Sequence, residues 1–195
     1  MKKQLKAMLL VAVTGAAAST AQAAIYNGDL LIGFTAQSGN DFIYDLGSAS
    51  SLVNGQTWDF SAFLAGFNLN TVSWGVIGDK SGSPRVAWTT TGGTIPATLS
   101  GNADWATLDT PTKSIYSNFG TAGAGQSLSI SANDDNSWNQ QTINGALNTQ
   151  YHNAYGDPNV TGLGADSFFT VAANGADPVQ LGSFSLGANG TLSYS

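Results

Sequence analysis

The sequence predicts a mainly β protein, an antiparallel sandwich or a strongly curved sheet of hairpins with one short helix packed on it. All 12 acidic residues are Asp, Glu is absent, and 24 of the 195 residues are Gly. Glu is a good helix former, whereas Asp favours turns, so this choice of acid favours strands and turns. Five Asn-Gly dipeptides are candidate chain reversals, because Asn-Gly tolerates the positive φ angles of a type I′ turn. Apolar residues also alternate with a period of two in several segments.

Residues 1–23 have the pattern of a secretory signal peptide. Lys2, Lys3 and Lys6 precede an apolar stretch over 7–18, and Ala21 and Ala23 fit the small-x-small rule for cleavage. We therefore expect a protein exported to the cell surface or the medium, with residues 24–195 as a single β-rich domain. Three basic and twelve acidic side chains would remain, a net charge of −9.

The first expected hairpin joins residues 30–35 and 42–46. Apolar side chains occupy alternate positions at Leu30, Ile32 and Phe34, and Leu31 lies between the first two. This is the spacing of a strand with apolar side chains on both faces. The turn residues 38–40 separate this strand from the second one.

Residues 59–68 show a different period and predict the short helix. Phe60, Phe63, Leu64 and Phe67 fall at i, i+3, i+4 and i+7, which is one helical stripe. Asp59 is placed to cap its N-terminus.

A second hairpin is expected from strands at 72–76 and 86–90 around a turn at 79–82. Trp74 and Trp88 lie within these alternating segments and are expected in the core.

The pattern is weaker over residues 92–164. Pro111 is suited to the first position of a short helix that would include Ile115 and Phe119. Leu128 and Ile130 alternate as in a strand. The stretch 131–164 is rich in Asn, Gln, Asp and Gly, so we expect surface loops there, with a helical turn near 146–147.

The C-terminal part predicts a strand over 168–172 and a hairpin of 178–186 and 191–194. This hairpin resembles the first one at a constant offset of 150 residues, as Leu31 and Leu181 or Phe34 and Phe184 illustrate. The likeness is explained either by two amphipathic hairpins with similar turns or by an internal duplication. We expect both hairpins to lie close together, as chain ends often do.

Four segments resemble exported bacterial proteins of the PEP-CTERM-associated type. They include GDLLIGF at residues 28–34, the segments 44–47 and 72–78, and LGSFSLGANGTL at residues 181–192. The resemblance implies association with the cell surface and with exopolysaccharide, and it carries no catalytic motif. The Pro-Glu-Pro tail of that group is absent from the printed sequence, so release and surface attachment are both open.

Composition argues against several function classes. Only six basic residues are present, three of them before residue 7, which is too few for a surface that tracks nucleic acid phosphates. Zero Cys excludes disulfides and thiolate chemistry. His152 is the single imidazole, and no Gly-x-Ser-x-Gly motif accompanies it. We therefore expect a protein that is not an enzyme.

Two pairs of residues are candidates for ligand binding. Trp105 and Trp138 lie in polar sequence, where indole rings could stack on sugars, although packing over a small core is the alternative. Asp134 and Asp135 bunch oxygen ligands that suit calcium, with an ordinary solvated turn as the alternative. No other cofactor is expected.

The leading functional hypothesis is a secreted, non-catalytic structural or extracellular-matrix protein that self-associates through β-edges. Its partners would be other copies of the chain or extracellular polysaccharide, with no membrane span in the mature chain. The second hypothesis is a carbohydrate-binding module that uses Trp105 and Trp138. A glycoside hydrolase with paired Asp carboxylates is the third.

Overall fold

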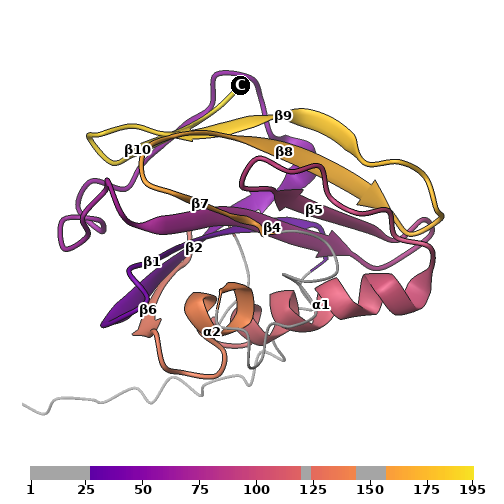
Figure 1. The fold of residues 1–195 in the computed structure, drawn as a ribbon, viewed down its shortest axis with the longest axis horizontal. Coiled ribbons are helices and arrows are strands. Elements are labelled where there is room, and N and C mark those ends of the chain that lie inside the picture. Colours follow the sequence, from indigo (N-terminus) through magenta and orange to yellow (C-terminus); the bar gives the residue numbers. More distant parts are fainter. Residues whose placement is uncertain (1–26, 120–123, 144–156) are drawn as a thin grey trace, which may run out of the picture.

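A computed structural model describes residues 27–119, 124–143 and 157–195. It confirms the predicted fold class, because ten antiparallel strands form one curled sheet, a half-barrel, with two helices (Figure 1). The predicted signal peptide lies outside the described residues. The elements are β1 (Asp29–Thr35), β2 (Asn40–Ser48), η1 (Ala49–Ser51), β3 (Thr57–Asp59), β4 (Ser73–Lys80), β5 (Val86–Thr90), α1 (Asn102–Tyr116), β6 (Ser127–Ser131), α2 (Trp138–Thr142), β7 (Asn159–Thr161), β8 (Gly164–Ala172), β9 (Val179–Leu186) and β10 (Thr191–Tyr194).

The strand order is β3-β10-β9-β8-β5-β4-β1-β2-β6, and β7 pairs with β4. The predicted hairpins β1–β2, β4–β5 and β9–β10 are all present. The strand predicted at 128–130 is β6, which pairs with β2. Because the path starts at β3 and ends at β6, these two strands are the edges of the sheet among the described residues.

The sheet is buried on both faces, as the alternation in β1 predicts. Leu31 belongs to the core under the helices, whereas Leu30 and Ile32 belong to the core on the opposite face. Both helices lie on one side of the sheet (Figure 1). We call this side the helix face and the other side the aromatic face.

The helix predicted over residues 59–68 is wrong, because the segment folds as successive turns. The Leu64 amide donates to the Phe60 carbonyl over 2.9 Å, but the Phe67 amide donates to the carbonyl only three residues back. The Asp59 carboxylate accepts from the Ser61 amide, which makes a local turn rather than a helix cap. The predicted packing is nevertheless present, since Phe60 and Leu64 are buried against the aromatic face.

The helix expected to begin at Pro111 begins nine residues earlier, at Asn102, and Pro111 lies inside it. The N-cap is Gly101, which provides no side-chain cap. Asp104 instead accepts hydrogen bonds from the amide and hydroxyl of Ser100. The hydrogen bonds between Ser100 and Asp104 close the first turn of α1. The prediction of a start at Pro111 did not take this pair into account.

The expectation of surface loops over residues 131–164 is wrong for part of the segment. It contains α2 and β7, and Trp138 at the start of α2 is fully buried. Ser137 caps this helix by accepting from the Gln140 amide. The helical turn expected near residue 146 lies outside the described residues.

The two similar hairpins do not pair with each other, because β4, β5 and β8 separate them in the sheet. The curl of the sheet nevertheless brings their side chains into one core on the aromatic face, as the shared burial of Phe34 and Phe184 shows. The turn segment also joins them, since the Phe60 amide donates to the Gly190 carbonyl over 3.0 Å.

Candidate functional site

The sequence predicted that Trp105 and Trp138 lie in polar loops. In the structure both residues lie on helices and are buried, as in the alternative of packing over a core. Trp138 is 0 % exposed and its indole nitrogen donates to Asn159 Oδ1 over 2.8 Å. The ring lies directly on the backbone of Gly33, where an added Cβ would meet it at 1.8 Å. An indole enclosed in this way offers no face to a sugar ring.

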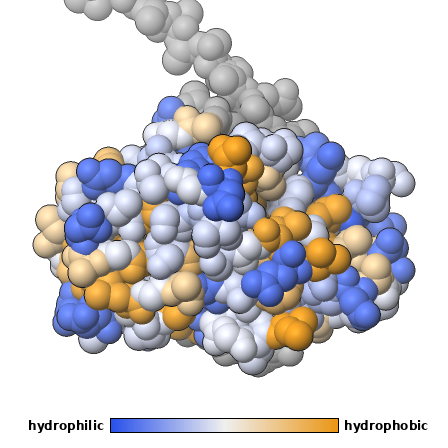
Figure 2. Space-filling model, turned by 90° about the horizontal axis from the view of Figure 1, so that it is seen from above, coloured by the Kyte–Doolittle hydropathy of each residue, from blue (hydrophilic) through white to orange (hydrophobic). Residues whose placement is uncertain are grey.

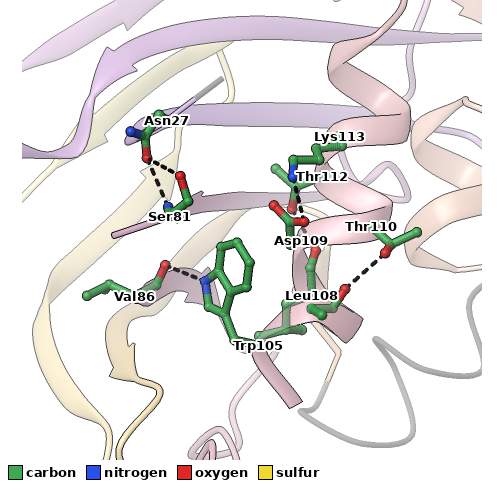
Figure 3. A network of polar contacts seen from close by, with 10 residues as sticks. Asn27, Ser81, Val86, Trp105, Leu108, Asp109, Thr110, Thr112 and Lys113 are labelled. Carbon is green, nitrogen blue, oxygen red and sulfur yellow. Dashed lines mark hydrogen bonds and ion pairs between the residues drawn. The ribbon is translucent and has the colours of Figure 1, made fainter. Parts of the chain in front are cut away.

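Trp105 is 4 % exposed and belongs to α1. Its indole nitrogen donates to the Val86 carbonyl over 3.1 Å, which ties α1 to the start of β5 (Figure 3). The Arg85 guanidinium lies 4.9 Å from the ring centre, and the Lys113 amine lies 5.9 Å from it. These contacts give Trp105 a structural role in joining helix to sheet.

Asp134 and Asp135 lie in the exposed turn between β6 and α2. The Asp134 carboxylate accepts from the Asn136 amide over 2.9 Å, as in an ordinary Asx turn. Within residues 27–119, 124–143 and 157–195, no group of three or more His, Cys, Asp or Glu side chains gathers around a common point. Asp134 and Asp135, the proposed calcium ligands, therefore have no third acidic ligand beside them among the described residues.

The outer edge of β6 is the candidate interaction site. The Ala132 amide donates to the Gly39 carbonyl, and the Asp45 amide donates to the Gln126 carbonyl, each over 2.9 Å. In an antiparallel ladder, alternate residues face the partner strand. The backbone N–H and C=O groups therefore point toward β2 at residues 126, 128, 130 and 132. Those of Ser127, Ser129 and Ser131 point outward, away from the sheet.

No side chain of β6 is charged, and the strand has no Pro or Gly. The three Ser side chains are exposed, and Leu128 and Ile130 pack partly against the core of the helix face. The Ser131 carbonyl accepts from the Asp134 amide, so the outward groups available for pairing centre on Ser127 and Ser129. An uncharged edge of this kind is a template for another strand.

The strand at the opposite edge of the sheet, β3, differs from β6 in length and in charge. β3 has three residues, pairs with β10, and carries Asp59. A short edge with a charge is poorly suited to pairing with another chain. The candidate site is therefore at one edge of the sheet.

The helix face also contains buried carboxyl groups that the sequence reasoning missed. Asp41 and Asp45 of β2 and Asp79 of β4 are at most 1 % exposed. Asp41 accepts from the Asn139 amide at the start of α2 over 2.7 Å, and Asp45 accepts from the Tyr116 hydroxyl of α1 over 3.1 Å. The sequence signal that could have found these buried acids is their alternation with residues that point to the opposite face of the sheet, such as Phe42.

The Asp109 carboxyl of α1 acts electrostatically on Asp79, and Lys113 forms an ion pair with Asp109 over 2.7 Å (Figure 3 shows the ion pair). Burial, followed by the neighbouring Asp109 carboxyl, raises the pKa of Asp79 to about 8. Burial also raises the pKa of Asp41. These carboxyls tie the two helices to the sheet.

The visible surface in Figure 2 carries apolar side chains in separate patches between polar ones. The exposed large apolar residues among the described ones are Val53, Phe63, Ile95, Leu163, Val179 and Leu181. Across the described part of the chain, no helix has the length and apolar character needed to cross a bilayer.

Comparison of the chain with protein families, curated proteins and solved structures gives no match. The functional argument therefore depends on the geometry described above.

Proposed function

We propose that this protein is an exported, non-catalytic structural component that self-associates through the outer edge of β6. Its destination is the cell surface or the extracellular matrix. The observation that carries the proposal is the five-residue edge with no charge, whose outward backbone groups centre on Ser127 and Ser129. The opposite edge has three residues and a carboxylate, so pairing is directed to β6.

The partner with the best fit is β6 of a second copy. Two antiparallel copies of Ser-Leu-Ser-Ile-Ser related by a twofold axis would match in length and in alternation. Such an isologous contact closes a dimer, whereas pairing of β6 with β3 would continue as a filament. The mismatch of five residues against three favours the dimer.

The other two hypotheses receive less support from the geometry. Trp105 and Trp138 are buried, so a sugar site built on them would require their exposure. A glycosidase separates its carboxyl groups by about 5 to 9.5 Å around the glycosidic bond. Asp79 and Asp109 are instead 1 % and 9 % exposed, and Asp109 forms an ion pair with Lys113, an arrangement that suits a structural tie.

Sedimentation velocity over a wide range of protein concentration tests self-association. We expect a dimer in the wild type and a monomer in Ser129→Pro, because Pro removes an outward amide without removing a backbone hydrogen bond to β2. Thr57→Lys on β3 is the matched control and should dimerise like the wild type. A wild type that is monomeric throughout, or a Ser129→Pro variant that associates as strongly as the wild type, would contradict the proposal.

Export has a separate test. Full-length protein expressed in a bacterium should be recovered outside the cytoplasm with Ala24 as its first residue. Cytoplasmic protein that retains residues 1–23 would contradict export and would leave the sedimentation result unaffected.

A further inference from the structure

Four of the five Asn-Gly dipeptides lie in the described residues, and each has the chemistry for spontaneous deamidation. In this reaction the Gly nitrogen loses its proton and attacks Cγ of the Asn side chain, a C–N bond forms, and ammonia leaves. Water then opens the resulting succinimide ring at either carbonyl, which gives aspartate or isoaspartate. Gly favours the attack because it has no Cβ to hinder the approach of its nitrogen. The Asn residues are Asn27, Asn54, Asn174 and Asn189.

The fold restrains the attacking nitrogen in all four dipeptides. Each Gly amide donates to a backbone carbonyl over 2.8 to 2.9 Å, so its proton is held and its nitrogen is not free to turn toward the Asn side chain. All four Asn residues are exposed, so access of water does not distinguish them. The rates must therefore differ by how firmly each dipeptide is held. The acceptors are the carbonyls of Asp79 for Gly28, Tyr194 for Gly55, Leu99 for Gly175 and Gly187 for Gly190.

The side chain of Asn54 differs from those of the other three Asn residues. In the other three, the side-chain oxygen accepts a hydrogen bond from a backbone amide, which fixes the carboxamide group. The donors are the amides of Ser81, Ala176 and Thr191, which contact Asn27, Asn174 and Asn189 over 2.9, 3.0 and 3.1 Å, respectively. Within the described part of the chain, the Asn54 side chain has no hydrogen-bond partner. Its carboxamide is therefore free to turn toward the Gly55 nitrogen.

Tyr194 of β10 holds the turn that contains Gly55. The Gly55 amide donates to the Tyr194 carbonyl over 2.8 Å, and the Tyr194 amide donates to the Gln56 carbonyl over 2.9 Å. The Tyr194 ring is 8 % exposed, and its centroid lies 6.2 Å from that of Phe168 and 5.0 Å from that of Phe184. Gly55 is therefore protected for as long as the Tyr194 ring stays in the core of the aromatic face.

We propose that Asn54 is a deamidation site of the folded protein and that the contact of Gly55 with Tyr194 sets its rate. When the end of β10 opens locally, the Gly55 amide is released and the Asn54 side chain reacts. The product has a carboxylate in the turn before β3 and, as isoaspartate, a main chain that is longer by a methylene group. β3 has three residues and pairs with β10, so we expect this edge of the sheet to loosen. β6 is at the other edge, so the inference does not depend on self-association.

Peptide mapping by mass spectrometry, after incubation of the purified protein in mildly alkaline buffer, tests the site. Deamidation is measured at each of the four dipeptides in folded protein and in protein unfolded by guanidinium, which gives each rate without the fold. We expect similar rates at all four sites in the unfolded protein and lower rates in the folded protein. In the folded protein, Asn54 should react about five-fold faster than Asn174 and Asn189, which is the factor that one side-chain hydrogen bond provides.

Tyr194→Ala tests the role of the contact with Gly55. Truncation of the buried ring should free the end of β10 and raise the rate at Asn54 by at least about ten-fold, because a buried ring stabilises its surroundings more than one hydrogen bond does. The rate at Asn174 should not change, since Gly175 is held by Leu99. Tyr194→Phe keeps the ring and should behave like the wild type. If Tyr194→Ala does not fold, Tyr194→Leu provides the same comparison.

Two results would overturn the inference. One is a rate at Asn54 in the folded protein that is equal to or lower than the rates at Asn174 and Asn189. The other is an unchanged rate at Asn54 in a folded variant that lacks the Tyr194 ring.

Discussion

The two faces of the sheet are both buried but are closed by different chemistry. On the aromatic face, the rings of Phe34, Phe42 and Phe60 contact one another at 5.6 to 6.0 Å, and Phe168 lies 5.0 Å from Phe184. On the helix face, apolar side chains alternate with the buried carboxyls of three strand residues, Asp41, Asp45 and Asp79.

Contacts between rings and buried carboxyl groups are expected to respond differently to pH. Contacts between Phe rings carry no titrating group, so their contribution does not change with pH. Buried carboxyls with a raised pKa stabilise the protein less as the pH rises. The aromatic face also contains one buried acid: Asp166 pairs across the sheet with Phe184, burial raises its pKa, and it holds the loop after β5 by accepting from the amides of Thr91 and Gly92.

Removal of a central ring from the aromatic face should have the largest effect. Phe34→Ala deletes a side chain that is 0 % exposed and contacts two other rings. We expect the free energy of unfolding to fall by about 3 to 5 kcal/mol, by the same amount at pH 5 and pH 8. Urea denaturation at both pH values measures this. A loss that differs strongly between the two pH values would contradict the expected pH independence of the contacts between Phe rings.

A methyl group between β1 and α2 should have a moderate effect on the helix face. In Gly33→Ala the new Cβ would meet the Trp138 ring at 1.8 Å, so ring and helix must shift. We expect a loss of about 1 to 3 kcal/mol. Gly66→Ala is the matched control, because nothing lies within 4 Å of its Cβ position, and it should be nearly neutral. Similar losses in both variants would show that Trp138 is not packed on Gly33 as described.

Removal of Lys113, the cation paired with Asp109, should have the smallest effect on stability. The Lys113 side chain is 50 % exposed, so Lys113→Gln should change the free energy of unfolding by less than about 1 kcal/mol. Lys113 lowers the pKa of Asp79, so without it that pKa should rise further. The pH at which the loss of stability levels off should therefore move upward in a series of urea titrations. A shift to lower pH would contradict the assigned contact.

Local alternation predicted most of the strands and three of their nine pairings, the hairpins β1–β2, β4–β5 and β9–β10. β1, β2, β4, β5, β9 and β10 follow from alternating apolar residues and turn dipeptides, because both signals are local. The alternation in β1 also predicted burial on both faces. The order of the hairpins in the sheet could not be predicted, because it depends on contacts between residues far apart in the chain.

The misassigned residues were those whose environment depends on tertiary packing. The stripe at 59–68 has a helical period, yet local bonds of Asp59 and the contact with Gly190 hold it in turns. Trp138 lies in polar sequence but fills the space over Gly33. Buried Asp residues are unusual, and the proximity of α1 and α2 supplies one partner each to Asp45 and Asp41.

Protection of the outward amides of β6 tests the central functional claim most directly. Hydrogen exchange of the Ser127 and Ser129 amides can be followed at low and at high protein concentration, with the Leu128 and Ile130 amides, which face β2, as internal references. The account predicts that the Ser amides become protected at high concentration while the references do not change. Equal exchange of the Ser amides at both concentrations, in a protein that sediments as a monomer, would contradict the account.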